Sequence, residues 1–243
     1  MSLSVLSEDW LPPRLRYREA KVQELRELAV EGAVIVGPSG VGKSTLVRMA
    51  LPEAITIDCG SARTAASIAA RISMAMGLRS RRLGDVLREL RERPPHTIVL
   101  DDYTLARRNR STVSLVRVLA NYHRLVLVVH PHALNSPGVF GTVLRMPPYT
   151  PRELQGILED RVVEGELPVS EEAIAAVSSA LGSPQGPGSA RLALTVLREA
   201  LRLCLRSGDR EVTPKHVAQA LALLGLGVSP VFSSSHKKLC TLL

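Results

Sequence analysis

The chain has 243 residues, which is enough for an α/β core of about 150 residues and a smaller attached domain. Hydrophobic residues make up 45% of the sequence, so a sizeable core can be buried and disorder is not the default expectation. Aromatic residues make up only 3%, which argues against a stacking platform for single-stranded nucleic acid. The net charge of +8 favours a polyanionic partner, although an arginine-rich genome would give the same bias.

The cysteines and the N-terminal residues indicate the cell compartment. Cys59, Cys204 and Cys240 are far apart and lack the spacing of metal ligands, which is typical of reduced thiols in a cytosolic protein. The N-terminus has no basic flank followed by an apolar stretch, and no apolar run is long enough to span a bilayer. We therefore expect a soluble, cytoplasmic protein without a membrane partner.

The first 149 residues alternate between short apolar runs and longer amphipathic segments. The predicted strands cover 33–36, 54–58, 97–100, 125–129 and 143–146. The predicted helices cover 19–31, 43–50, 62–77, 84–93 and 111–121. Strands that alternate with helices predict an α/β fold with a mainly parallel sheet, covered on both faces.

From residue 150 the pattern becomes purely helical. Thr150 and Glu153 form a capping box with a proline between them at the first helical position. The helices predicted in this part cover 150–163, 170–181, 189–207 and 214–224. The sequence therefore predicts an α/β core over residues 1–149 and a small helical domain over 150–228.

A phosphate-binding motif lies between the first predicted strand and the helix that follows it. The sequence GPSGVGKS matches G-x-x-x-x-G-K-[ST], in which backbone N–H groups surround the phosphates at a helix N-terminus. Lys43 is expected to reach the β- and γ-phosphates of ATP, and the Ser44 hydroxyl to bind Mg²⁺. The residues predicted to form the nucleotide site are Gly37, Pro38, Ser39, Gly40, Val41, Gly42, Lys43, Ser44 and Thr45.

An acidic pair follows the apolar strand predicted at 97–100. Mg²⁺ prefers oxygen ligands, and a carboxylate at a strand end beside the phosphate loop suits it. We expect Asp101 to hold the metal or its water shell, and Asp102 to orient the attacking water. The alternative is an Asp-rich turn after a buried strand.

Several stretches together resemble AAA+ ATPases of the archaeal origin-recognition type, the replication initiators related to the eukaryotic origin recognition complex. The stretches that carry the resemblance are 13–19, 37–45, 97–102, 146–154 and 188–194. It implies a P-loop AAA+ core with a C-terminal helical lid, and a nucleotide switch that acts in replication initiation at origins. It also implies ATP or ADP with Mg²⁺, double-stranded DNA and other AAA+ initiator subunits as partners, and association with the nucleoid.

The resemblance gives further residues a role. Arg191 would point at the γ-phosphate, so that lid closure depends on the nucleotide; the alternative is a solvated helix-surface arginine. His130 occupies the first sensor position and would bond the γ-phosphate or the water, unless it is a loop or core histidine. Arg79, Arg81 and Arg82 fall near a DNA-touching insertion of these initiators, or they form a solvated loop.

Three departures from the family pattern put function in doubt. Asp102 stands where the family usually has glutamate, so the water would be held poorly and hydrolysis should be slow. The stretch 131–144 contains no arginine to reach into a neighbouring subunit. Relatives continue into a winged-helix domain, and residues 229–243 resemble only the opening of its first helix, which indicates a truncated protein or one that lost the domain.

Two other functions remain open. A signalling NTPase of the STAND type would share the phosphate loop and the acidic strand end, and would use nucleotide to control oligomerisation. The segment 147–154 and the motif around Arg191 argue against this type. A degenerate paralogue would bind nucleotide and act only as an interaction module, which Asp102 and the missing arginine favour.

Overall fold

The computed structural model describes residues 2–106, 110–136 and 138–226 and divides the chain into two compact units. One unit is Pro13–Pro148, and the other joins Met1–Pro12 to the chain from Tyr149 onward. Each is described by itself. The tail predicted at 229–243 lies outside the described residues, and within them no helix is long and apolar enough to cross a membrane.

The first unit is built on a sheet of five parallel strands. The strands are β1 Ala33–Val36, β2 Ile55–Asp58, β3 Thr97–Asp101, β4 Arg124–Val129 and β5 Thr142–Arg145. Their order across the sheet is β2-β3-β4-β1-β5, and every pairing is parallel. The predicted α/β fold class is thus confirmed. Because all strands run the same way, the loops that follow them meet at one edge of the sheet.

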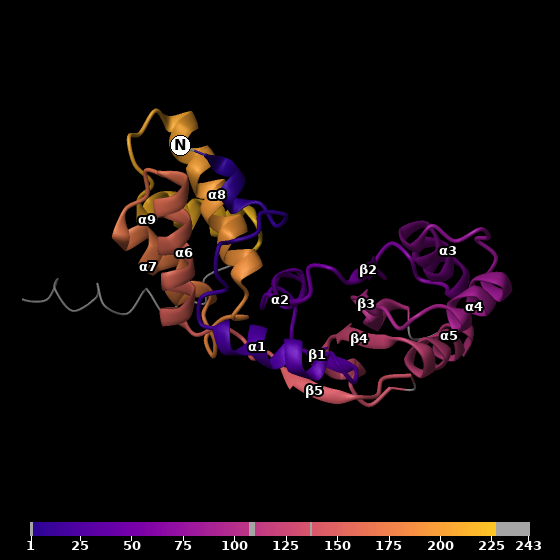
Figure 1. Cartoon of the computed structure of the whole chain (residues 1–243). Coiled ribbons are helices and arrows are strands. Elements are labelled where there is room, and N and C mark those ends of the chain that lie inside the picture. The colour runs from indigo at the N-terminus through magenta and orange to yellow at the C-terminus, as the bar shows by residue number, and fades with distance from the viewer. Residues whose placement is uncertain (1, 107–109, 137, 227–243) are drawn as a thin grey trace, which may run out of the picture. The chain divides into compact units, whose positions relative to one another are not determined.

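Helices cover this sheet on both sides (Figure 1). They are α1 Glu19–Leu28, α2 Lys43–Ala50, α3 Ala65–Met76, α4 Leu83–Glu92 and α5 Arg110–Tyr122. One buried cluster joins alternate strand residues such as Val34, Ile98 and Leu127 to α3, α4 and α5. The residues between them, such as Ile35, are equally buried, which explains why the strands read as continuous apolar runs.

The core unit differs from the expectation in a few short segments. Helix α1 ends at Leu28 rather than at residue 31, and residues 29–31 form turns that lead to Gly32, whose φ is +99°, just before β1. Two 3-10 turns that follow strand ends, η2 Tyr103–Leu105 and η3 Pro131–Ala133, were not predicted. Such short turns have no periodicity that a sequence pattern can reveal.

The second unit contains four helices among its described residues. They are α6 Pro151–Gly165, α7 Glu171–Leu181, α8 Ala190–Ser207 and α9 Pro214–Leu223. The predicted capping box is present, with the Thr150 hydroxyl and the Glu153 carboxylate bonding each other's backbone N–H. Ser170 and Ser189 cap α7 and α8, at the starts of the helices predicted at 170–181 and 189–207.

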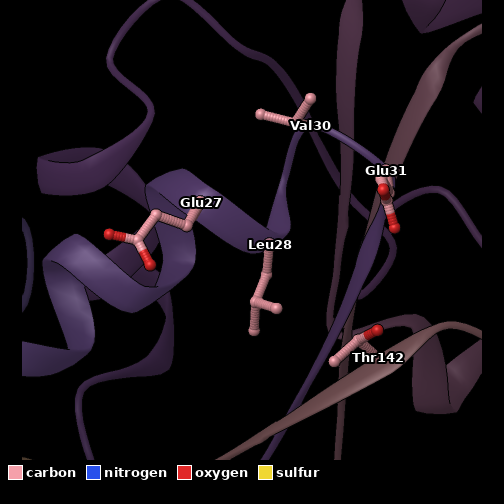
Figure 2. A pocket seen from close by; sticks show the side chains of 5 residues that line it. All are labelled: Glu27, Leu28, Val30, Glu31 and Thr142. Carbon is pink, nitrogen blue, oxygen red and sulfur yellow. The ribbon is translucent and has the colours of Figure 1, made fainter.

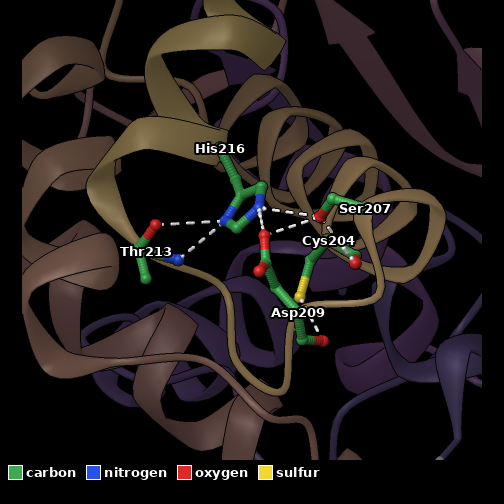
Figure 3. A network of polar contacts seen from close by, with 5 residues as sticks. All are labelled: Cys204, Ser207, Asp209, Thr213 and His216. Atoms are coloured by element: carbon green, nitrogen blue, oxygen red, sulfur yellow. Dashed lines mark hydrogen bonds and ion pairs between the residues drawn. The ribbon is translucent and has the colours of Figure 1, made fainter.

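A polar network closes the turn between α8 and α9 (Figure 3). The Ser207 hydroxyl donates to the Asp209 carboxylate at 2.6 Å, and His216 Nε2 lies 3.0 Å from the same oxygen. The Thr213 N–H donates to His216 Nδ1 at 3.1 Å, so Nε2 carries the ring proton toward Asp209. The Cys204 thiol donates to the Asp209 carbonyl at 3.3 Å. The network has the role of a helix cap.

The first twelve residues are a correction to the predicted core of residues 1–149. This segment, called the strap here, includes a 3-10 turn η1 over Leu3–Leu6 and groups with the helical unit. Val5 and Leu6 are buried, and η1 contacts α6 and α8. The prediction placed the strap in the core unit because the two are adjacent in the sequence. Two apolar residues in a short segment do not indicate which hydrophobic core they pack into.

The core unit begins and ends at the same place. Arg18 is buried, with 6% of its surface exposed, and its Nη2 donates to the Pro147 carbonyl at 3.0 Å. Its Nη1 donates to the carbonyl of Tyr17, whose φ of +66° turns the chain into α1. Arg18 therefore fastens the start of this unit to its last residues.

Candidate nucleotide-binding site

Residues 37–42 form the loop between β1 and α2, at the carboxyl edge of the sheet, and residues 43–45 begin α2. Gly40 and Gly42 take φ values of +79° and +87°, which glycine adopts without strain. A Cβ at Gly37 would lie only 2.5 Å from the Met146 carbonyl, so a side chain is excluded there. Val41 is fully buried and anchors the loop from inside.

Lys43 is the first residue of α2 and lies against the loop. Its Nζ donates to the carbonyls of Gly37 and Pro38 at 2.8 and 2.7 Å. The first turn of α2 has no acidic residue, so the positive end of the helix dipole and the Lys43 ammonium give the loop a positive potential. The loop therefore offers backbone N–H groups and a cation to an anion, as a phosphate cradle requires.

Asp101 ends β3 and lies beside the helix start that carries Ser44. Burial raises the pKa of the Asp101 carboxyl, and a hydrogen bond from the Ser44 hydroxyl lowers it in part. The Asp102 N–H also donates to Asp101 Oδ1 at 2.9 Å. The structure thus brings together the hydroxyl and the carboxylate that the sequence analysis assigned to one metal ion.

Asp102 begins the turn that follows β3. Its φ is +51°, a left-handed conformation that aspartate tolerates better than most residues. Its side chain is exposed, and a Cβ at Gly60 would lie 3.9 Å from its Oδ2, so its carboxylate lies beside the turn after β2. Its role toward a water molecule stays a prediction.

His130 follows β4, the strand between β3 and β1, and so lies between Asp101 and the loop. Its N–H donates to the Thr104 hydroxyl at 2.8 Å. The pKa of its imidazole is lowered, first by burial and then by His132 and Lys43, while Asp102 opposes the shift. The imidazole ring is therefore neutral near pH 7, and the charges of Lys43 and Asp102 both act on it. Thr104 was not identified from the sequence, because it lies in the turn η2, which has no sequence pattern that predicts it.

Arg191 lies in the helical unit, in the first turn of α8. Ser189 caps this helix by accepting the Leu192 N–H at 3.3 Å. The Arg191 Nε lies 3.0 Å from a carboxylate oxygen of Glu8 in the strap. The role of Arg191 toward a nucleotide stays a prediction, and Glu8 was not identified from sequence.

Arg79, Arg81 and Arg82, called the arginine loop here, connect α3 to α4 and are exposed. Ser80 between them is held inward: the Ser73 hydroxyl donates to its carbonyl at 2.6 Å, and its own hydroxyl donates to Asp85 at 3.0 Å. The backbone is therefore fixed while the three cations face solvent. This arrangement suits phosphate contacts but is equally that of a solvated loop.

A hollow of about 490 Å³ lies near the other end of the strands, at the start of β1 and β5 (Figure 2). It is lined by Glu27, Leu28, Val30, Glu31 and Thr142. Two carboxylates and no cation make it unsuitable for phosphates. It is separate from the predicted nucleotide site, because ligands of parallel α/β sheets bind at the carboxyl ends of the strands.

The residues at the carboxyl edge fit a magnesium nucleotide. Gly40 and Gly42 give the loop the left-handed conformations of a phosphate loop, and Ser44 and Asp101 supply two hard oxygen ligands. Among the described residues, no cluster of three or more His, Cys, Asp or Glu could hold a metal ion without a nucleotide. A metal here would therefore take its remaining ligands from phosphate and water oxygens.

Comparisons with known proteins give a family model, a curated relative and solved structures to which this chain is similar. A family model described as an AAA domain of the dynein-related subfamily matches residues 32–133. An ORC1-type DNA replication protein 1 of Aeropyrum pernix is 29% identical over 268 residues, which cover 90% of this chain and 67% of that protein. The structure of Cdc6p from Pyrobaculum aerophilum has a TM-score of 0.82 at 25% identity and covers 94% of this chain and 73% of its own. The Aeropyrum pernix ORC1 protein in complex with DNA has a TM-score of 0.80 at 23% identity, with coverage of 92% and 69%.

Proposed function

The chain belongs to the AAA+ ATPases of the archaeal origin-recognition (ORC1/Cdc6) type, and on this basis we propose that it is an ATP-binding switch in DNA replication initiation. In this proposal it binds ATP with Mg²⁺, hydrolyses it slowly, and changes its DNA or partner binding with the nucleotide state. It acts in the cytoplasm, on the chromosome.

One observation carries the nucleotide part of the proposal. The Ser44 hydroxyl and the Asp101 carboxylate come from segments more than fifty residues apart and are hydrogen-bonded to each other at the carboxyl edge of the sheet. Burying a carboxylate raises its pKa and costs free energy, which a divalent cation offsets. A merely structural Asp-rich turn has no need for a desolvated carboxylate beside a phosphate loop.

Each side chain of the site has a proposed role. Lys43 moves from the loop carbonyls to the phosphates, and Ser44 and Asp101 hold Mg²⁺, which neutralises charge on the phosphates. Asp102 orients the attacking water, and neutral His130 donates a hydrogen bond to that water or to the γ-phosphate. Arg191 binds the γ-phosphate and reports its presence to the helical unit.

Hydrolysis is proposed to be slow for two reasons. The Asp102 side chain is one methylene shorter than glutamate, and a mispositioned water can raise the barrier by several kcal/mol. Residues 131–144 contain no arginine, and a finger supplied by a neighbouring subunit is worth on the order of 10³–10⁵ in rate.

The DNA part of the proposal rests on charge and on the relatives. The Aeropyrum pernix ORC1 protein is described in complex with DNA, and this chain carries a net charge of +8. The arginine loop supplies exposed cations on a fixed backbone, and backbone-phosphate contacts need no more. We propose double-stranded DNA as the partner, bound weakly by residues 1–243 alone, together with other AAA+ initiator subunits.

The nucleotide part is tested by calorimetric titration with ATP and ADP, with magnesium and with EDTA. We expect binding that depends on magnesium and falls by about 100-fold or more in Lys43→Ala, because the cation that meets the phosphates is lost. Lys21→Ala is the matched control, since Lys21 lies on α1 in an ion pair with Glu24. Equal binding by both variants, or no binding by the unmodified protein, would refute the proposal.

A second candidate function is favoured by the same departures in sequence. Asp102 and the arginine-free stretch 131–144 suit a module that binds nucleotide without hydrolysing it. Single-turnover assays with radiolabelled ATP separate the two. Phosphate release that is lost in Lys43→Ala supports the slow ATPase, and its absence over many hours supports the binding module.

A further inference from the structure

The strap is fixed to the helical unit before it reaches Glu8. The Ser2 N–H donates to the Gly165 carbonyl at 2.8 Å, and Val5 and Leu6 are only 4% and 1% exposed. A Cβ at Gly165 would lie 2.7 Å from a methyl group of Val5, so glycine allows this close approach. This half of the strap therefore has a defined position on α6.

The strap is fixed again just after Glu8. The guanidinium of Arg161 on α6 lies 3.8 Å from the centre of the Trp10 ring. Arg161 is buried, and burial lowers its pKa to about 10 even though Glu164 and Asp160 oppose the shift. A desolvated guanidinium gains more from an aromatic face than an exposed one does. Glu8 is thus carried between two anchored points.

Glu8 meets the residue proposed to read the nucleotide. Its Oε2 lies 3.0 Å from the Nε of Arg191, in the first turn of α8. That turn contains no acidic residue, although a helix N-terminus favours a negative charge and disfavours a positive one. Glu8 supplies from the strap the negative charge that this helix start lacks.

We propose that Glu8 is a positioning residue that competes with the terminal phosphate of ATP for Arg191. The inference rests on the proposed function, in which Arg191 binds the γ-phosphate. The pair with Glu8 occupies the Nε donor of Arg191 and offsets its positive charge, so both are less available to the γ-phosphate while the pair persists. ADP has no γ-phosphate and leaves the Glu8–Arg191 pair intact. The pair therefore lowers the preference for ATP over ADP.

The expected effect is modest because both side chains are about half exposed, 49% for Arg191 and 54% for Glu8. Exposed ion pairs of this kind change an equilibrium by about two- to fivefold. We expect Glu8→Gln to raise the ratio of the ADP and ATP dissociation constants by this factor, mainly through tighter ATP binding. The increase should shrink at high salt.

The experiment compares calorimetric titrations with a non-hydrolysable ATP analogue and with ADP, both with magnesium. Glu211→Gln removes an exposed carboxylate elsewhere on the helical unit and is the matched control. Arg191→Ala should lower the ratio, and Glu8→Gln added to Arg191→Ala should change nothing further. Thermal melts of each variant show whether the strap still docks.

The outcomes separate this inference from the proposed function. If Arg191→Ala lowers the ratio and Glu8→Gln leaves it unchanged, Glu8 does not compete and the inference is wrong. If Arg191→Ala leaves the ratio unchanged, the sensing role of Arg191 fails, and the role of Glu8 fails with it. A rise that Glu211→Gln reproduces, or that persists without Arg191, would be general electrostatics and would also overturn the inference.

Discussion

The two units assemble their functional residues in different ways. In the core unit, the parallel sheet brings the ends of β1 and β3 to one edge, where Ser44 at the start of α2 meets Asp101, whose carboxylate is desolvated there. In the helical unit, Arg191 is placed by a local cap and by a half-exposed pair with Glu8. The geometry of the core site is thus built into the sheet, whereas the helical unit holds Arg191 by contacts that are easily exchanged.

The two described cysteines offer the largest contrast between the units. Burial raises the pKa of Cys59 to about 12, and Asp101, Asp58 and Asp102 add to the shift. The pKa of Cys204 is also raised, by burial and then by Asp209, but by less. We expect iodoacetamide at pH 8 to label Cys59 about 10³-fold more slowly than a free thiol, because its thiolate is that much rarer. Mass spectrometry of peptides over time measures both sites. Equal labelling rates for Cys59 and Cys204 would contradict the contrast.

A matched pair of glycine substitutions tests each unit separately. A Cβ at Gly37 would meet the Met146 carbonyl at 2.5 Å, and one at Gly182 would meet the Pro151 nitrogen at 2.5 Å. We expect each alanine variant to lose about 1–3 kcal/mol of unfolding free energy, because backbone must shift in both.

Only one of the two should also affect the ligand. Gly37→Ala should lose nucleotide binding and Gly182→Ala should keep it, as measured by denaturant unfolding and calorimetry. Gly84→Ala is the control, since its Cβ would meet nothing within 4 Å on helix α4. Retained nucleotide affinity in Gly37→Ala would show that the loop is not the phosphate site.

Two aspartates with opposite pKa shifts give the next effect. The Asp101 pKa is raised by burial, so its charge destabilises the fold above its ordinary value of about 3.9. Asp101→Asn should therefore raise the melting temperature at pH 7, and the gain should vanish as pH falls below 4. It should also weaken magnesium-dependent ATP binding by at least about tenfold, since losing an outer partner of a metal ligand already costs that much.

The Asp209 variant should behave in the opposite way. Hydrogen bonds from Ser207 and His216 lower the Asp209 pKa, so its stabilisation is present above about pH 3.9 and is lost as pH falls through the lowered value. Asp209→Asn should lower the melting temperature at pH 7 and have little effect in acid. Circular dichroism across the pH range measures both variants, and shifts of the same sign in the two would be inconsistent with this account.

The smallest expected effect concerns DNA. Replacing the three cations of the arginine loop by alanine should reduce the slope of log affinity against log salt by up to about three, one for each lost phosphate contact. Filter-binding titrations from low to moderate salt measure the slope. The control removes the same charge from the helical unit in the triple variant Arg202→Ala, Arg206→Ala and Arg210→Ala. If both triple variants reduce the slope equally, the overall positive charge and not the arginine loop accounts for DNA binding.

The sequence predicted those features that depend on local pattern. Apolar runs marked the five strands, Gly and Lys spacing marked the loop at 37–45, and Thr150 and Glu153 marked a helix start where one is found. The strand order across the sheet did not follow from these patterns, because pairing between distant strands leaves no periodic trace.

Other features depend on which core receives a short segment. The docking of Val5 and Leu6 on the helical unit, and with it the contact of Glu8 with Arg191, is decided by packing alone. The left-handed conformation of Asp102 and the bond from His130 to Thr104 arise in turns too short to show a pattern. Glu8 and Thr104 were therefore not predicted, because their partners, Arg191 and His130, are remote in the sequence.

The clamp made by Arg18 on the Pro147 carbonyl has a consequence for how such a protein can be rebuilt. Because the Arg18 guanidinium is bonded to the Pro147 carbonyl, the start and the end of the unit Pro13–Pro148 lie close together. Ends that lie this close can be rejoined by a short linker, which is what a circular permutant of this unit requires.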